Sequence, residues 1–187
     1  KMCIRDSDDT ASLAIVATDT ATEEGGAQNT AVTLTLGGTG TGAAELAVPV
    51  TADVIDAGGG TAVSGTDYTP IGTQTLTFVA GSTNGAVENA VVTPTNDLLV
   101  EGNETVNLTL QNVSSLDGQG SITAASNTTT IDDNDTASLA IVATDTATEE
   151  GGAQNTAVTL TLGGTGTGSA ELAVPVTADI VDAGGGS

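Results

Sequence analysis

Short stretches in which apolar and polar residues alternate dominate this chain, and no helical period accompanies them. Val32, Leu34 and Leu36, for example, stand at every second position. Because successive side chains of a strand point to opposite faces, this spacing predicts half-buried β-strands. Strands are predicted over residues 11–17, 30–36, 45–51, 74–79, 86–92, 105–111 and 121–131. The chain is therefore predicted to be all-β.

Clusters of turn residues separate these predicted strands, for example at residues 37–40 and 58–60. About seven short strands separated by such turns predict an immunoglobulin-like Greek-key β-sandwich. Pro49 stands at a polar-facing position of the third strand, and proline cannot donate to a ladder, so we expect that strand at a sheet edge. Tyr68 and Phe78 are the only aromatic residues, and we expect both in the core.

A tandem repeat organises the chain. Residues 9–61 recur as residues 135–187, at an offset of 126 and with four differences. This period is one domain long, which predicts a complete sandwich over residues 8–135 and the N-terminal half of a second, identical-type repeat over residues 136–187. Such a half would leave strand edges open to pairing with another chain. Residues 1–7 resemble the translation of a sequencing adapter, and we interpret them as foreign to the protein.

Acidic side chains far outnumber basic ones. The sequence has 24 Asp and Glu against 2 Lys and Arg, no His, and a formal net charge of -22. Both bases, Lys1 and Arg5, lie in the seven-residue leader. Nucleic acid and anionic membrane surfaces are excluded as partners, because phosphate binding relies on basic side chains. The longest apolar run, residues 13–17, is too short for direct membrane insertion.

The same composition argues against catalysis. A pair of acids could serve as a glycosidase couple. However, the chain has no His, no base beyond the leader and only two aromatic residues to stack on a sugar. We therefore predict no catalytic residues and no enzymatic activity.

Three carboxylates stand close together ahead of the predicted strand 105–111, at Asp97, Glu101 and Glu104. The intervening Gly102 and Asn103 favour a turn that brings Glu101 and Glu104 within about 7 Å. Carboxylates held this close repel each other unless a cation lies between them. Carboxylate and carbonyl oxygens suit Ca²⁺, which takes about 6 to 8 oxygens in flexible geometry, better than Mg²⁺, which demands near-octahedral geometry.

Two further acidic segments accompany this loop. Residues 132–135 end the last strand of the repeat, and Glu23 and Glu24 lie between the first two strands. In a Greek-key sandwich, loops of this kind meet at one end. A calcium β-roll is the alternative for a chain rich in Gly and Asp, but its nonapeptide period is absent from the sequence.

On these motifs the chain resembles the Calx-beta family, the calcium-binding sandwich repeats of sodium-calcium exchanger regulatory loops, an integrin subunit and many bacterial surface proteins. The resemblance covers residues 8–135 and then restarts. Its markers are Glu24 with Gly25, residues 60–70 with Asp67 and Tyr68, residues 75–78, residues 97–104, and residues 131–133.

The resemblance implies calcium ligands at the positions that match the family's motif. They are Glu24, Asp67, Asp97, the carbonyl of Leu99, Glu101, Glu104, Asp132 and Asp133. Asn96 and Asn134 stand where the richest sites of the family carry Asp, which implies fewer ions or weaker binding. The remaining acids singled out are expected to be solvated charges: Asp19, Glu23, Glu45, Asp53, Asp56, Glu88 and Asp117.

The resulting prediction is a calcium-binding structural repeat of a large extracellular or bacterial cell-surface protein, in adhesion or cell communication. Calcium would rigidify the acidic loops and the junction between repeats. The expected partners are calcium ions, neighbouring repeats and an extracellular protein or glycan. Two alternatives stay open: an adhesin or ligand-binding module with incidental calcium, and an acidic solubilising spacer without a specific site.

Overall fold

The computed structural model describes residues 2–3, 9–39, 43–114 and 119–184. Most of the predicted leader, and Asp117 with its predicted solvated charge, lie outside these ranges. The chain divides into two compact units. The first runs up to Asn96 and resumes over Asn103–Asp132, and the second comprises Asp97–Gly102 and the residues from Asp133 onward.

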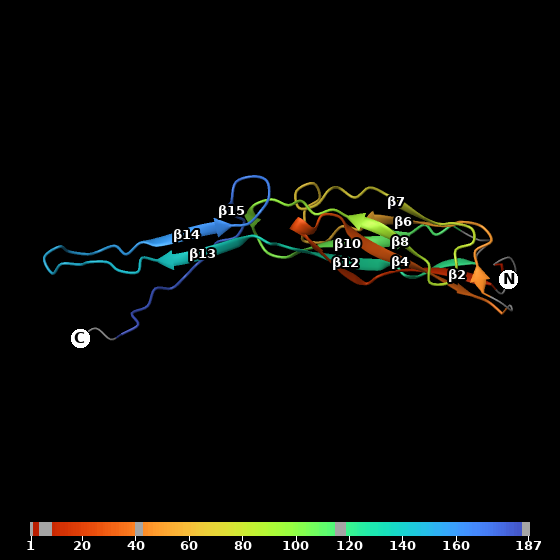
Figure 1. Cartoon of the computed structure of the whole chain (residues 1–187), viewed down its shortest axis with the longest axis horizontal. Coiled ribbons are helices and arrows are strands. Elements are labelled where there is room, and N and C mark those ends of the chain that lie inside the picture. The colour runs from red at the N-terminus through yellow and green to blue at the C-terminus, as the bar shows by residue number, and fades with distance from the viewer. Residues whose placement is uncertain (1, 4–8, 40–42, 115–118, 185–187) are drawn as a thin grey trace. The chain divides into compact units, whose positions relative to one another are not determined.

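The first unit is a β-sandwich, which confirms the predicted all-β fold class (Figure 1). Its five-stranded sheet has the order β3-β12-β10-β6-β7, and its four-stranded sheet has the order β11-β2-β4-β8. The strands are β2 (Thr10–Ile15), β3 (Thr18–Thr22), β4 (Gln28–Gly37), β6 (Val50–Asp56), β7 (Gln74–Phe78), β8 (Val87–Val92), β10 (Glu104–Gln111), β11 (Gly120–Ala124) and β12 (Ser126–Asp132). The chain crosses between the sheets from β4 to β6, from β7 to β8 and from β8 to β10, which is Greek-key connectivity.

Minor elements complete this unit. The two-residue strands β1 (Met2–Cys3) and β5 (Ala44–Glu45) pair in parallel. A short 3-10 helix, η1 (Glu23–Gly25), follows β3 directly.

The apolar residues of the two sheets form one core. Leu13 and Leu34 of the four-stranded sheet belong to the same buried cluster as Val54 and Leu108 of the five-stranded sheet. Each large aliphatic side chain buried in this way contributes about 1.5 to 3 kcal/mol. Tyr68 and Phe78 also belong to this cluster, so the prediction that both aromatic residues are core residues is confirmed.

The third predicted strand is misplaced. At the start of residues 45–51 only Glu45 belongs to a strand, the two-residue β5. The long strand β6 begins at Val50. Val48, which was expected to point inward, is 49% exposed. The expectation of an edge strand is also wrong, because β6 pairs with both β10 and β7. Pro49 precedes β6, so its missing N–H removes no ladder hydrogen bond.

One other predicted strand divides between the sheets, because residues 121–131 contain parts of both β11 of the four-stranded sheet and β12 of the five-stranded sheet. The predicted strand 11–17 corresponds to β2 of the four-stranded sheet. The next strand, β3, was not predicted and lies in the five-stranded sheet. The two crossings are tied together, because Asn127 Nδ2 donates to the Val16 carbonyl at 2.9 Å and Thr128 N donates to the Ala17 carbonyl at 3.0 Å.

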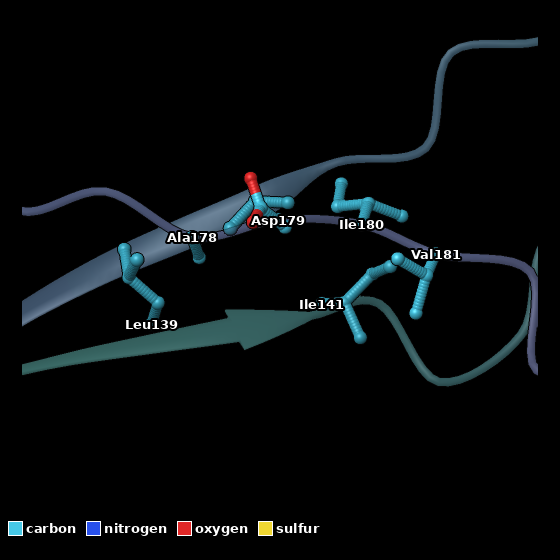
Figure 2. A pocket seen from close by; sticks show the side chains of 7 residues that line it. Leu139, Ile141, Ala178, Asp179, Ile180 and Val181 are labelled. Atoms are coloured by element: carbon cyan, nitrogen blue, oxygen red, sulfur yellow. The ribbon is translucent and has the colours of Figure 1, made fainter.

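The second unit holds an antiparallel hairpin of β13 (Thr136–Ile141) and β14 (Val158–Gly163). In this hairpin Leu139 pairs with Leu160, and Ile141 pairs with Val158. Leu139, Ile141 and Val158 line an open groove together with residues 178–181 (Figure 2). A short strand β15 (Glu171–Leu172) pairs in parallel with β9 (Leu99–Val100). Among the described residues, no helix has the length and apolar character needed to cross a membrane.

Candidate metal site

Asp67 is fixed by a tight turn in the first unit. Its Oδ2 accepts the backbone N–H of Val63, and its own N–H donates to the Val63 carbonyl at 3.0 Å. Tyr68 anchors the turn, because its hydroxyl donates to Asp56 Oδ2. The Asp67 side chain is only 7% exposed. The chain thus buries and orients a carboxylate although no Lys or Arg is among the described residues.

A second carboxylate of the same unit faces Asp67. Glu104 is the first residue of β10, is partly buried and pairs with Ile131 of β12. Carboxylate oxygens of Asp67 and Glu104 lie within 4.8 Å of each other. At an effective dielectric constant of about 20, two unit negative charges at this separation repel by about 3 kcal/mol. A cation between these two predicted ligands would therefore lower the electrostatic repulsion between their carboxylates.

Asp132, at the end of β12, contacts the start of β10. Its Oδ1 accepts a hydrogen bond from Asn103 Nδ2 at 2.6 Å. Asp132 also pairs with Thr22 in the parallel β12–β3 ladder. The Asn103 side chain, predicted as a turn residue, therefore also joins two strand ends.

Asp133, in the second unit, organises the acidic loop 97–102. Its Oδ2 accepts the backbone N–H groups of Glu101 and Gly102, both at 2.9 Å, and its Oδ1 accepts that of Asp135 at 2.7 Å. Gly102 has a φ of 123°, a conformation that glycine adopts without strain. One carboxylate thus holds the loop backbone on one side and the following chain on the other.

Asp97 shapes the beginning of the same loop. Its Oδ1 accepts the backbone N–H of Leu99 at 2.8 Å, which is an Asx turn. Leu99 then enters β9, where flanking backbone bonds run from Glu171 N to the Leu98 carbonyl at 3.1 Å and from Ala173 N to the Val100 carbonyl at 3.0 Å. The loop that carries Asp97 and Leu99 is therefore ordered by its Asx turn and by backbone hydrogen bonds from the β15 segment.

Two acids that sequence reasoning left out of the ligand set are buried. Glu23 is 4% exposed, so its prediction as a solvated charge is wrong, whereas Glu24 is exposed. In the structure Glu23 continues the alternation of β3, since Ala21 is buried, Thr22 is exposed and Glu23 is buried again. Asp135 is 8% exposed, and carboxylate oxygens of Asp133 and Asp135 lie within 4.8 Å of each other.

Asn134 supplies a further oxygen. Its Oδ1 atom is buried, and no hydrogen bond reaches it within the part of the chain that the structure describes. A buried carbonyl-type oxygen of this kind costs about 1 to 3 kcal/mol unless it finds a donor, a water molecule or a cation. Such an oxygen suits Ca²⁺, which takes neutral amide oxygens as well as carboxylates.

Acids away from these segments make ordinary surface contacts. Glu88 is exposed, as predicted. The Thr75 hydroxyl, at 2.7 Å, and the Asn112 amide, at 3.0 Å, donate to the two oxygens of Asp53 and lower the pKa of that carboxyl from its usual value. Burial, aided by the hydrogen bond to Asp56, raises the pKa of the Tyr68 phenol.

Comparison with known proteins found similarity among solved structures only. No protein-family model matches the chain, and no curated protein matches it. The chain is similar to the apo form of the Calx CBD1 domain, with a TM-score of 0.49 and 18% identity over 67% of this chain and 98% of that one. It is also similar to CBD12 of CALX1.2, with a TM-score of 0.48 and 19% identity over 66% and 45% of the two chains. For the Calx CBD2 domain the TM-score is 0.49, with 12% identity over 65% and 86%.

A further similar structure, with a TM-score of 0.44 and 17% identity over 65% and 45% of the two chains, is described as the calcium binding domain CBD12 of CALX1.1.

Proposed function

We propose that this chain is a calcium-binding structural module. The observation that carries the proposal is the Asp67–Glu104 pair, whose carboxylate oxygens lie within 4.8 Å of each other in a chain whose described residues include no Lys or Arg. Calcium–oxygen distances are about 2.3 to 2.6 Å, so oxygens on opposite sides of one ion lie about 4.6 to 5.2 Å apart. The pair has the spacing that a shared calcium ion requires.

The proposed ligand set is the one that the sequence motifs imply: Glu24, Asp67, Asp97, the Leu99 carbonyl, Glu101, Glu104, Asp132 and Asp133. The buried Glu23 and Asp135 and the buried Oδ1 atom of Asn134 join it as further oxygen donors. Residues 97–102 directly precede Asn103 and Glu104, so Asp97 and Glu101 are at most seven residues from Glu104 in the sequence. A calcium ion supplies positive charge to this acid-rich set and performs no reaction.

The protein side chains do the remaining work. Asp133 holds the backbone of Glu101 and Gly102. The turn at Val63 holds Asp67. Because these contacts fix the carboxylates before any ion arrives, the conformational entropy lost on binding is reduced. Calcium bound to the folded state alone stabilises it by RT ln(1 + [Ca²⁺]/Kd), about 2.7 kcal/mol at 100 times Kd.

The setting that best fits such a module is a tandem array in an extracellular or cell-surface protein. The near-identical copies support an array, because residues 9–61 and 135–187 differ at only four positions. The acidic residues 132–135 directly precede the second copy of β2, so an ion held there would stiffen the connection between repeats. Neighbouring repeats are the partners that follow from this arrangement.

Thermal unfolding of the full chain in calcium and in chelator tests the proposal. We expect calcium to raise the Tm. We also expect Glu104→Gln to act with opposite signs: it removes a ligand, so it lowers the Tm in calcium, and it removes repulsion with Asp67, so it leaves the Tm unchanged or raised in chelator.

The matched control is Glu88→Gln, because Glu88 is exposed on β8. This variant makes the same charge change and should respond to calcium as the unmodified chain does. The proposal is wrong if millimolar calcium leaves the Tm of the unmodified chain unchanged, or if both variants respond alike.

A further inference from the structure

Thr105, the neighbour of Glu104 on β10, bonds through both of its backbone groups to residues 61 and 62. Its N–H donates to Thr61 Oγ1 at 2.9 Å, and its carbonyl accepts the N–H of Ala62 at 3.1 Å. In return, the Thr61 N–H donates to Thr105 Oγ1 at 3.1 Å. We call these three hydrogen bonds the threonine clamp. The clamp fixes a segment that lies outside the strands to the beginning of β10.

The clamp lies where regular strand pairing is absent. The ladder between β6 and β10 covers only residues 108–111 of β10, so it does not reach Thr105. At Thr105 the hydroxyl of Thr61 takes the place of a ladder carbonyl as the acceptor of the backbone N–H. Gly60 permits this close approach, because a Cβ at residue 60 would clash with the Thr105 carbonyl oxygen. Residues 60 and 61 are thus both suited to contact with Thr105.

The clamp leads directly into the turn that carries Asp67. Val63 follows Ala62 in the chain, and its N–H donates to Asp67 Oδ2. The Val63 carbonyl accepts the N–H of Asp67 at 3.0 Å. One peptide bond therefore separates the clamp from the residue that holds Asp67, and one peptide bond separates it from Glu104.

The other contacts of this turn fix it from other sides. The Tyr68 hydroxyl donates to Asp56 at the end of β6, and the Thr95 N–H donates to the Asp67 carbonyl at 2.9 Å. Neither contact includes a residue adjacent to Glu104. The clamp is thus the direct connection between the turn and the beginning of β10.

We propose that Thr61 and Thr105 are positioning residues that set the separation between the carboxylates of Asp67 and Glu104. The inference rests on the proposed calcium function. A cation binds two carboxylates most tightly when both are already held at its contact distance, because less conformational entropy is then lost. The second copy has Ser187 at the position equivalent to Thr61, and serine keeps the hydroxyl that the clamp uses.

Calorimetric titration of the full chain with calcium tests this role in Thr61→Val. Valine has the shape of threonine but lacks the Oγ1 acceptor. We expect the Kd for calcium to rise about tenfold, the lower end of the loss that follows removal of a contact behind metal ligands. Thr105→Val should act in the same direction, because it removes the acceptor of the Thr61 N–H. Thr61→Ser keeps the hydroxyl and should bind within about twofold of the unmodified chain.

Thr75→Val is the matched control. The Thr75 hydroxyl on β7 donates to Asp53 Oδ1 at 2.7 Å, so this variant also replaces a hydrogen-bonded threonine by valine. Its Kd for calcium should stay within about twofold of that of the unmodified chain. Thermal melts in chelator should show a similar loss of Tm for Thr61→Val and Thr75→Val, so lost stability alone would not explain weaker binding by the first.

Amide hydrogen exchange in chelator gives a second readout that needs no bound ion. Thr61→Val removes the acceptor of the Thr105 N–H, and we expect the faster exchange to extend to the N–H groups of Val63 and Asp67. Thr75→Val should leave these groups unchanged. Faster exchange confined to Thr105, or a Kd of Thr61→Val within about twofold of that of the unmodified chain, would overturn the positioning role.

The same experiments separate this inference from the proposed function. Absence of calcium binding by the unmodified chain would refute the proposed function. The exchange measurement would then still decide whether the clamp positions Asp67, because it is made without calcium. Calcium binding by the unmodified chain together with equal binding by Thr61→Val would leave the proposed function in place and refute the positioning role alone.

Discussion

Replacing Tyr68 with phenylalanine tests how the chain positions Asp67. The Tyr68 side chain is 3% exposed, and its hydroxyl donates to Asp56 Oδ2. Phenylalanine keeps the ring in the core and removes only that hydrogen bond. Tyr68 is also the only tyrosine of the chain, so the substitution removes every phenol that could ionise.

The size of the expected loss of stability depends on the hydrogen bonds that Asp56 retains in the variant. A hydrogen bond to a charged acceptor is worth about 1.5 to 3 kcal/mol. Asp56 is only half-buried, and its other oxygen still accepts the Gly58 N–H at 2.8 Å, so water replaces part of the loss. We therefore expect Tyr68→Phe to lower the free energy of unfolding by about 1 to 2 kcal/mol, or the Tm by about 3 to 8 °C.

The pH dependence of this effect has a definite sign. Burial and Asp56 raise the pKa of Tyr68 above its ordinary value of 10.0, so the folded state holds the phenolic proton more tightly than the unfolded state. This stabilisation is complete below about pH 10 and is lost as the pH rises through the folded pKa. The phenylalanine variant has no such proton, so the stability difference between the two proteins should shrink with rising pH.

Thermal melts followed by circular dichroism from about pH 9 to pH 12 measure this difference. The absorbance of tyrosinate reports the Tyr68 pKa directly. A tyrosinate transition at or below pH 10 in the folded protein, or parallel loss of stability by both proteins, would refute the reasoning.

Four further substitutions test the packing and the surface hydrogen bonds. Leu13→Ala should lower the free energy of unfolding by about 2 to 5 kcal/mol, whereas the same change at the equivalent but exposed Leu139 should cost under about 0.5 kcal/mol, as measured by denaturant unfolding. Hydrogen bonds lower the pKa of Asp53, so its stabilisation is present above pH 3.8 and lost as the pH falls through the folded pKa. Under acid titration, the Asp53→Asn variant should therefore lose stability less steeply than the unmodified chain does. Gly60→Ala should lower the Tm, because the added Cβ would clash with the Thr105 carbonyl oxygen.

The sequence pattern predicted which residues face inward better than where strands begin and end. Leu46, Val48 and Val50 alternate in the sequence, yet Val48 is exposed because β6 starts only at Val50. Alternation shows which side chains point to the same face of a strand, but it does not show where the pairing between strands begins. Here the pairing begins at Val50, directly after Pro49. It also cannot detect a strand that changes sheets, because both halves of such a strand keep an inward face, as Ile15 and Ala21 do.

The acidic site was predictable in part for a related reason. Asp67 and Glu104 stand in motifs that the sequence displays, and the structure brings their carboxylates together. Choosing Glu23 over Glu24 required knowing which residues of β3 point inward. The sequence does not show where β2 ends and β3 begins, so this orientation could not be predicted from it. Asp135 was visible as an acid, but its burial depends on how the chain turns after Asp133.

Calorimetric titration of the full chain with calcium tests the central claim most directly. The account predicts saturable binding of a whole number of ions, weakened at least about tenfold by Asp67→Asn or Glu104→Gln and unchanged by Glu88→Gln. An acidic chain without a specific site would instead take up calcium gradually, without a fixed stoichiometry, and would respond equally to all three substitutions. That second result would contradict the proposal that these carboxylates form a calcium site.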